Sequence, residues 1–115
     1  MSSLLTKNCI PCSGSIPPLE DDQKLILLKE LSSIWELVDG GKKLRAIVKC
    51  SEFSGPMKIA NDIAVIADKQ WHHPDLHISF GQLGIDLWTH KIDDLVESDF
   101  IFAAKIDEVL KSYEI

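Results

Sequence analysis

The sequence has few cysteines, no excess of basic charge and no long apolar run. Its 115 residues include three cysteines and 45% hydrophobic residues, and its formal net charge is −6. A structural zinc site usually takes four ligands, and the sequence has no second Cys pair and no His pair at zinc-finger spacing, so no metal site is expected. The acidic balance argues against direct binding of nucleic acid, but it leaves open a partner protein that itself binds nucleic acid. Without a long apolar run, no membrane-spanning helix is expected.

A chain of this length is expected to fold as one domain with a small core. We expect residues 1–18 to form an N-terminal arm or loop and residues 19–115 to form the single domain. The start of the sequence has the pattern of neither a secretory signal nor a transit peptide, so a cytoplasmic location is expected. Cys9 and Cys12 lie in a segment rich in Ser, Gly and Pro, and we interpret them as ordinary reduced thiols in a loop.

Apolar periodicity predicts three helices and four strands in the order α-β-β-α-β-β-α. A first amphipathic helix follows the acidic residues 20–22 and carries Leu25, Leu28 and Leu31 on one side. The other expected elements are strands at 35–38 and 44–50, a helix at 54–71, strands at 76–80 and 83–90, and a helix at 97–112. Two hairpins and three helices indicate an α+β fold, in which three helices pack on one face of a four-stranded antiparallel sheet.

Two short histidine motifs are the most informative feature, His72-His73-Pro74 and Trp88-Thr89-His90. The unperturbed pKa of histidine lies near neutrality, so converging imidazoles can give and take protons without a metal or another cofactor. Asp68 precedes His72 by four residues, which predicts a hydrogen bond between them if the helix continues that far. The alternative is a polar helix stop, because the residue before a proline is disfavoured in a helix.

The second hairpin gives a reason to expect convergence. If Gly81-Gln82 is its two-residue turn, Leu76 pairs with Leu87 on the apolar face. The same register, extended to the strand ends, places His73 opposite His90. The sequence therefore predicts that the two motifs are neighbours.

The motifs resemble those of the pterin-4a-carbinolamine dehydratase family. The resemblance rests on Ala67–Pro74, on Leu87–His90 and on the acidic residues that follow, and it covers nearly the whole chain. It implies removal of water from a 4a-hydroxytetrahydropterin to give quinonoid dihydropterin, in tetrahydrobiopterin recycling, with no cofactor. By motif matching, the catalytic residues are His72, His73 and His90. The matched substrate-binding candidates are Asp68, Pro74, Trp88, Thr89 and Asp99.

The chain departs from the family pattern at two positions. Asp68 stands where the family commonly has glutamate, and Leu76 stands where an aromatic residue often follows the motif, which weakens the case for stacking on the pterin there. Trp88 is either an aromatic surface for the pterin or a cross-strand packing residue. Asp99 is either a site residue or a solvated acid in the first turn of a helix. His77 is expected on the surface, whereas Trp35 and Trp71 are expected to be packing residues rather than ligand contacts.

The stretch Phe100–Ala104 is apolar on nearly every side of the last helix. It indicates either a deeply buried helix or a subunit contact, and we expect a homodimer or homotetramer. Some members of the resembled family bind the dimerisation helices of a transcription factor. The alternative function is therefore an interaction module that acts as a dimerisation cofactor of a transcription factor. A third function to consider is a pterin-related role outside aromatic amino-acid hydroxylation. It stays open because the sequence does not identify the C6 substituent of the pterin.

Overall fold

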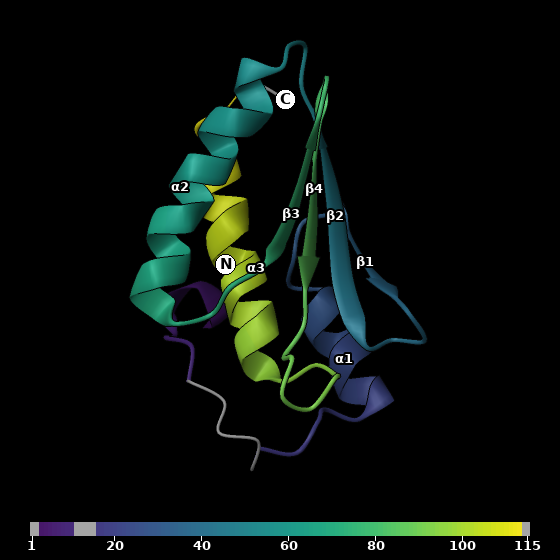
Figure 1. The fold of residues 1–115 in the computed structure, drawn as a ribbon. Coiled ribbons are helices and arrows are strands. Elements are labelled where there is room, and N and C mark those ends of the chain that lie inside the picture. The colour runs from purple at the N-terminus through teal and green to yellow at the C-terminus, as the bar shows by residue number, and fades with distance from the viewer. Residues whose placement is uncertain (1–2, 11–15, 114–115) are drawn as a thin grey trace.

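The computed structural model describes residues 3–10 and 16–113. Its helices are α1 (Asp21–Leu28), α2 (Ser54–Gln70) and α3 (Glu97–Leu110), preceded by a short 3-10 helix, η1 (Ser3–Thr6). Its strands are β1 (Trp35–Val38), β2 (Lys43–Lys49), β3 (Asp75–Ser79) and β4 (Gln82–Leu87). The strands form one antiparallel sheet in the order β1-β2-β4-β3, and α2 and α3 lie along one of its faces (Figure 1). The predicted α+β fold, with three helices and a four-stranded antiparallel sheet, is confirmed.

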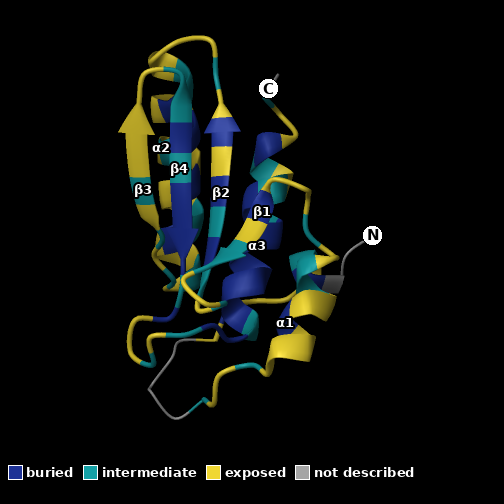
Figure 2. Ribbon diagram, turned by 90° about the vertical axis from the view of Figure 1, so that its right-hand side faces the viewer, coloured by how far each residue is buried: buried dark blue, intermediate teal, exposed yellow. Residues whose placement is uncertain are grey.

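The core lies between the sheet and the helices. Successive side chains of a strand point to opposite faces, so alternate residues of the two central strands face α2 and α3. Figure 2 shows β4 and the middle of α3 mostly in the colour of buried residues, whereas β3 at the sheet edge is mostly exposed. The buried strand residues are Leu44, Ala46, Val48, Leu83, Ile85 and Leu87.

Helix α3 is the centre of this core. Phe100 and Phe102 are fully buried, and Ile101 is only 2% exposed. The deeply buried alternative is therefore correct, and the apolar stretch of this helix is not an exposed subunit contact. Its cover comes from the chain itself, because α2 and η1 both pack against α3.

The second hairpin has a different turn from the expected one. Ser79 pairs with Gln82, so the two-residue turn is Phe80-Gly81 rather than Gly81-Gln82. Gly81 has a φ of 78°, and type II turns place a glycine with positive φ at this second central position. The expected register is wrong by two residues, and Leu76 pairs with Ile85. A shift of two residues preserves the faces, so the apolar side of β3 remains the predicted one.

Helix α1 is held by a buried lysine as well as by part of its leucine stripe. Leu25 is 54% exposed, whereas Lys24 is 3% exposed. The Lys24 ammonium donates hydrogen bonds to the Gly41 carbonyl in the β1–β2 turn and to Asp94 in the loop before α3, both at 2.7 Å. Leu28 and Leu31 of the expected stripe are partly buried and pack against the core, so the prediction is wrong for Leu25 alone.

Part of the expected N-terminal arm is folded onto the domain. Leu4 in η1 is 1% exposed, and the Lys105 ammonium of α3 donates a hydrogen bond to the Leu5 carbonyl at 3.1 Å. Cys9 is a free thiol in a segment without regular secondary structure, as predicted, but its side chain is buried in the core cluster. Cys12, for which the same state is expected, lies outside the described residues.

Candidate active site

The end of α2 directs the first histidine motif towards α3. Trp71, the first residue after the helix, has the left-handed backbone angles φ 53° and ψ 41°. The Trp71 and His72 N–H groups both donate to the Ala67 carbonyl. A left-handed residue at this position turns the chain away from the helix axis. His72 therefore does not continue the helix face that carries Asp68.

His72 pairs instead with a buried carboxylate in the first turn of α3. Its Nε2 lies 2.6 Å from Oδ1 of Asp99, and the imidazole and carboxylate are 10% and 0% exposed. An ionised carboxylate only accepts hydrogen bonds, so with an ionised Asp99 the imidazole is the donor and carries its proton on Nε2. The imidazole also packs against the Phe102 ring, with the centroids 5.7 Å apart. Both contacts fix the orientation of the imidazole.

The second oxygen of Asp99 is held by the loop that follows β4. Oδ2 accepts hydrogen bonds from Thr89 Oγ1 and from the Val96 N–H, both at 2.9 Å. Thr89 is itself fixed, because its N–H donates to the Asp94 carbonyl at 2.9 Å. With three hydrogen bonds, the carboxylate is satisfied without water. The expectation of a solvated first-turn acid is therefore wrong for Asp99.

The three motif histidines line one open hollow of about 210 Å³. The His72 side chain is 10% exposed, whereas the His73 side chain is 56% exposed and His90 is exposed. A small molecule in this hollow would meet all three imidazoles. The lining residues are Trp71, His72, His73, Trp88, Thr89, His90 and Lys91.

Trp88 supports His90 within the hollow. The two rings meet edge-on, with centroids 4.2 Å apart and an interplanar angle of 85°. The Lys43 ammonium lies 4.2 Å from the centroid of the Trp88 ring, which is the distance of a cation–π contact. Since β4 ends at Leu87, His90 lies in a turn rather than in a strand. The predicted strand pairing of His73 with His90 is wrong, although both residues line the same hollow.

Asp68 and Pro74 lie beside this hollow, in an adjoining one of about 160 Å³ that also includes His73. Asp68 Oδ1 is 3.5 Å from Nε2 of His73, and these side chains are 83% and 56% exposed. The expected contact between Asp68 and His72 is wrong, because the turn at Trp71 moves His72 to the other side. An exposed ion pair of this kind contributes little to stability.

The N-terminal segment ties together the two elements that hold the His72–Asp99 pair. The Cys9 N–H donates to Gln70 Oε1 at 2.7 Å, and the Ile10 N–H donates to Ser98 Oγ at 2.9 Å. Gln70 ends α2, and Ser98 immediately precedes Asp99 in α3. The Cys9 thiol lies 3.4 Å from the Ser98 carbonyl, and burial raises its pKa to about 11.

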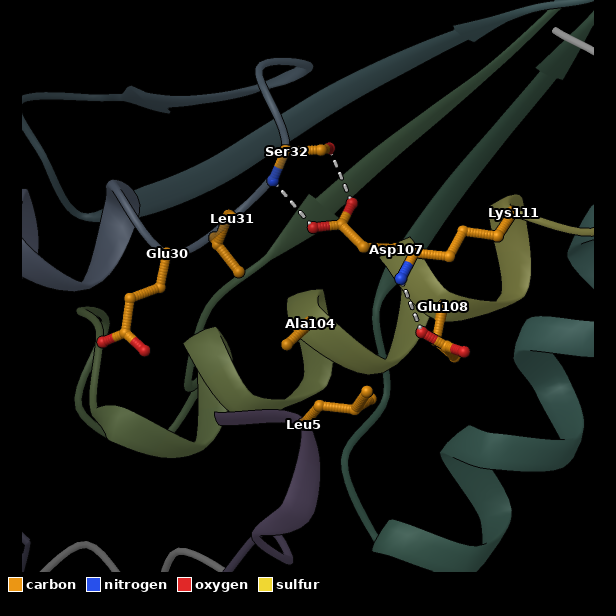
Figure 3. Close-up of a pocket in the computed structure, with 8 residues that line it drawn as sticks. All are labelled: Leu5, Glu30, Leu31, Ser32, Ala104, Asp107, Glu108 and Lys111. Carbon is orange, nitrogen blue, oxygen red and sulfur yellow. Dashed lines mark hydrogen bonds and ion pairs between the residues drawn. The ribbon is translucent and has the colours of Figure 1, made fainter. Parts of the chain in front are cut away.

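A larger hollow of about 310 Å³ lies between η1, the loop after α1 and α3 (Figure 3). Its main polar group serves the fold, since Asp107 accepts hydrogen bonds from the Ser32 N–H and Oγ and from Trp35 Nε1, at 2.7 to 2.9 Å. Lys111 pairs with Glu108 at 3.1 Å. No histidine lines this hollow, so the acid–base candidate is the one with the three imidazoles.

In the described ranges 3–10 and 16–113, no group of three His, Cys, Asp or Glu side chains could hold a metal ion. No helix in the same ranges has the length and apolar character needed to cross a membrane.

Sequence reasoning missed Trp71 and Lys91 as lining residues. Trp71 is 73% exposed, so the packing role expected for it is wrong, whereas Trp35 is buried as expected. His77 is exposed as predicted, with Nε2 3.5 Å from Asp86. The sequence did contain a signal for the position of Trp71. Pro74 disfavours helix at the residue before it, so the helix should end nearby, with Trp71 at its end beside the histidine motif.

The fold and the site together define a small α+β protein that gathers three imidazoles in one hollow, one of them held by a buried carboxylate. Residues 17–109 match the family model described as "Pterin 4 alpha carbinolamine dehydratase". The chain belongs to this family.

Similar proteins agree with this assignment. A relative from Rickettsia bellii (strain OSU 85-389), named "Putative pterin-4-alpha-carbinolamine dehydratase", is 49% identical over 105 residues, which are 91% of this chain and 92% of the relative. A relative of the same name from Rubrobacter xylanophilus is 40% identical over 109 residues, covering 95% of this chain and 100% of the relative. A crystal structure from Brucella melitensis, described as a "transcriptional coactivator/pterin dehydratase", has a TM-score of 0.74 and 25% identity, and covers 81% of this chain and 98% of that one.

Proposed function

We propose that this protein removes water from a 4a-hydroxytetrahydropterin to give quinonoid dihydropterin, by general acid–base catalysis with His72, His73 and His90. The observation that carries the proposal is the convergence of these imidazoles on one hollow, with His72 held by Asp99. Family membership and the names of the relatives support the substrate class. We further propose a cytoplasmic location and a role in tetrahydrobiopterin recycling.

The reaction requires two proton transfers. The proton on N5 goes to a base, a proton is delivered to the hydroxyl on C4a, the C4a–O bond breaks, and the N5=C4a double bond forms as water leaves. We assign the base to Nδ1 of His72, because Asp99 holds a proton on Nε2 and stabilises the positive charge that results. His73 or His90, which face solvent, delivers the proton to the hydroxyl. Each positioned proton transfer typically accelerates a reaction by about 10²- to 10⁴-fold.

The substrate-binding candidates divide into three groups by position. Trp88 and Thr89 line the hollow itself, and Asp68 and Pro74 line the adjoining one. Asp99 is fully buried beneath His72, so we assign it a positioning role rather than a contact with the substrate.

A dehydration assay with purified protein tests this proposal. The protein should accelerate dehydration of a 4a-hydroxytetrahydropterin in the presence of chelator, and His72→Ala and His90→Ala should each lower kcat/KM at least about tenfold. His77→Ala is the matched control, because His77 is exposed outside the hollow, and it should change little. Folded wild-type protein that gives only the buffer rate would overturn the proposal.

The interaction-module alternative has lost its main support. An exposed apolar helix face would favour it, but the apolar part of α3 is buried in the chain. One observation still favours the interaction module. The Brucella protein is described as a transcriptional coactivator, and that description is of the Brucella protein alone. A homodimer or homotetramer stays a prediction, and light scattering measures it directly.

A further inference from the structure

Trp71 combines a disfavoured backbone with a large exposed side chain. Its φ of 53° lies in the left-handed region, which residues with a Cβ atom rarely adopt. Glycine or asparagine usually occupies this position at a helix end. The Trp71 side chain does not repay the strain through core packing, since it is 73% exposed. Local folding therefore gives no reason for tryptophan here.

The position of Trp71 offers a reason. It lines the hollow with the three histidines and directly precedes His72 in the chain. Backbone strain concentrates at sites where a side chain must be held for function. An exposed indole on the wall of this hollow presents a flat aromatic face to any molecule that enters.

The other indole of the hollow is already engaged. The Lys43 ammonium lies over the Trp88 ring, and the His90 ring meets it edge-on. Trp88 thus serves to position His90, and its ring is less open to a ligand than that of Trp71.

We propose that Trp71 binds the flat heteroaromatic ring of the substrate by stacking, and so selects for ligands of the pterin class. The inference rests on the proposed function, because it assumes that the pterin reacts in this hollow. Stacking of a heteroaromatic base on an aromatic side chain is worth about one to two orders of magnitude in affinity. In the protein without ligand, the strained backbone at Trp71 lowers the stability and gains nothing in return. Replacing Trp71 should therefore raise the stability of the protein and weaken its binding of the pterin.

The test compares Trp71→Asn and Trp71→Phe with the wild type. Trp71→Asn removes the ring and suits the left-handed backbone, so its Tm should rise by about 4 °C while KM rises at least about tenfold with kcat within about threefold. Trp71→Phe keeps a stacking face and should keep KM within about threefold. The Kd of a stable oxidised pterin, 6-hydroxymethylpterin, measured by calorimetry should follow the same order. Phe80→Asn is the matched control, because Phe80 is 78% exposed but lies outside the hollow, and it should leave Kd unchanged.

The outcomes separate this inference from the proposed function. An active wild type together with unchanged KM and Kd in Trp71→Asn overturns the stacking role alone. An inactive wild type whose pterin affinity still depends on Trp71 overturns the dehydratase and supports the stacking role. A fall in assembly mass for Trp71→Asn, with Kd unchanged, would identify Trp71 as a contact between copies of the chain and would overturn the inference.

Discussion

The imidazole of His72 and the carboxylate of Asp99 form a contact of 2.6 Å between residues 27 positions apart. The pair is closed on its protein side, because Thr89 and the Val96 N–H bind the second carboxylate oxygen. Its exposed part belongs to His72, whose side chain is 10% exposed, whereas that of Asp99 is 0% exposed. Since Asp99 occupies Nε2, Nδ1 is the ring nitrogen left for the proposed base, which makes Asp99 the residue on which that base depends.

Replacing Asp99 by asparagine should lower kcat/KM by at least about 100-fold. The amide keeps the shape of the carboxylate but loses its charge, so it neither fixes the proton on Nε2 nor stabilises a charged imidazole. Steady-state kinetics measure the loss, and ¹⁵N NMR of the imidazole should show a changed tautomer for His72. Activity within threefold of the wild type, with an unchanged tautomer, would remove Asp99 from the site.

The change Asp68→Asn should alter kcat/KM by less than about threefold. Asp68 is exposed, and its 3.5 Å contact is with His73 rather than with the buried His72. Exposed ion pairs of this kind contribute about 0 to 1 kcal/mol. The same kinetic assay checks this, and Asp68→Glu should also stay near the wild type. If Asp68→Asn lowers kcat/KM as much as Asp99→Asn does, Asp68 must make a different contact in the substrate complex from its contact with His73 in the free protein.

The order of the elements was predictable because it depends on local patterns. Alternation identified β1 and β2, and a stripe at helical spacing identified α2 to within one residue of its end. The two histidine motifs were found for the same reason, since each is a short contiguous segment.

The contacts that orient the site could not be predicted from local sequence patterns. The His72–Asp99 pair depends on how α3 crosses the end of α2, and the left-handed turn at Trp71 decides which side His72 faces. The burial of Lys24 was missed because its partners, Gly41 and Asp94, come from distant loops. Patterns of apolar residues contain no information on such pairs.

The thiol of Cys9 should react slowly in the folded protein. Burial raises its pKa to about 11 from the ordinary 9.0, so at pH 8 its thiolate fraction is lower by about 100-fold than in the unfolded chain. In a Cys12→Ser background, alkylation followed by peptide mass spectrometry should show at least this difference between native protein and protein in urea. Equal rates in the two states would show that the N-terminal segment does not cover Cys9 in solution.

The ion pair of Lys24 and Asp94 should contribute to stability above about pH 4. Burial raises the pKa of Asp94, but hydrogen bonds from the Lys24 ammonium and the Leu95 N–H more than offset this, so the pKa is lowered from 3.8. A carboxyl group with a depressed pKa in the folded state stabilises the protein above its unfolded pKa, and this contribution is lost as the pH falls through the folded value. Asp94→Asn should therefore lower Tm by about 5 °C at pH 7, and the difference from the wild type should shrink below about pH 4. Thermal unfolding from pH 2.5 to 7 measures both quantities. A difference in Tm that stays constant across this range would show that Asp94 acts through shape and hydrogen bonding rather than through its charge.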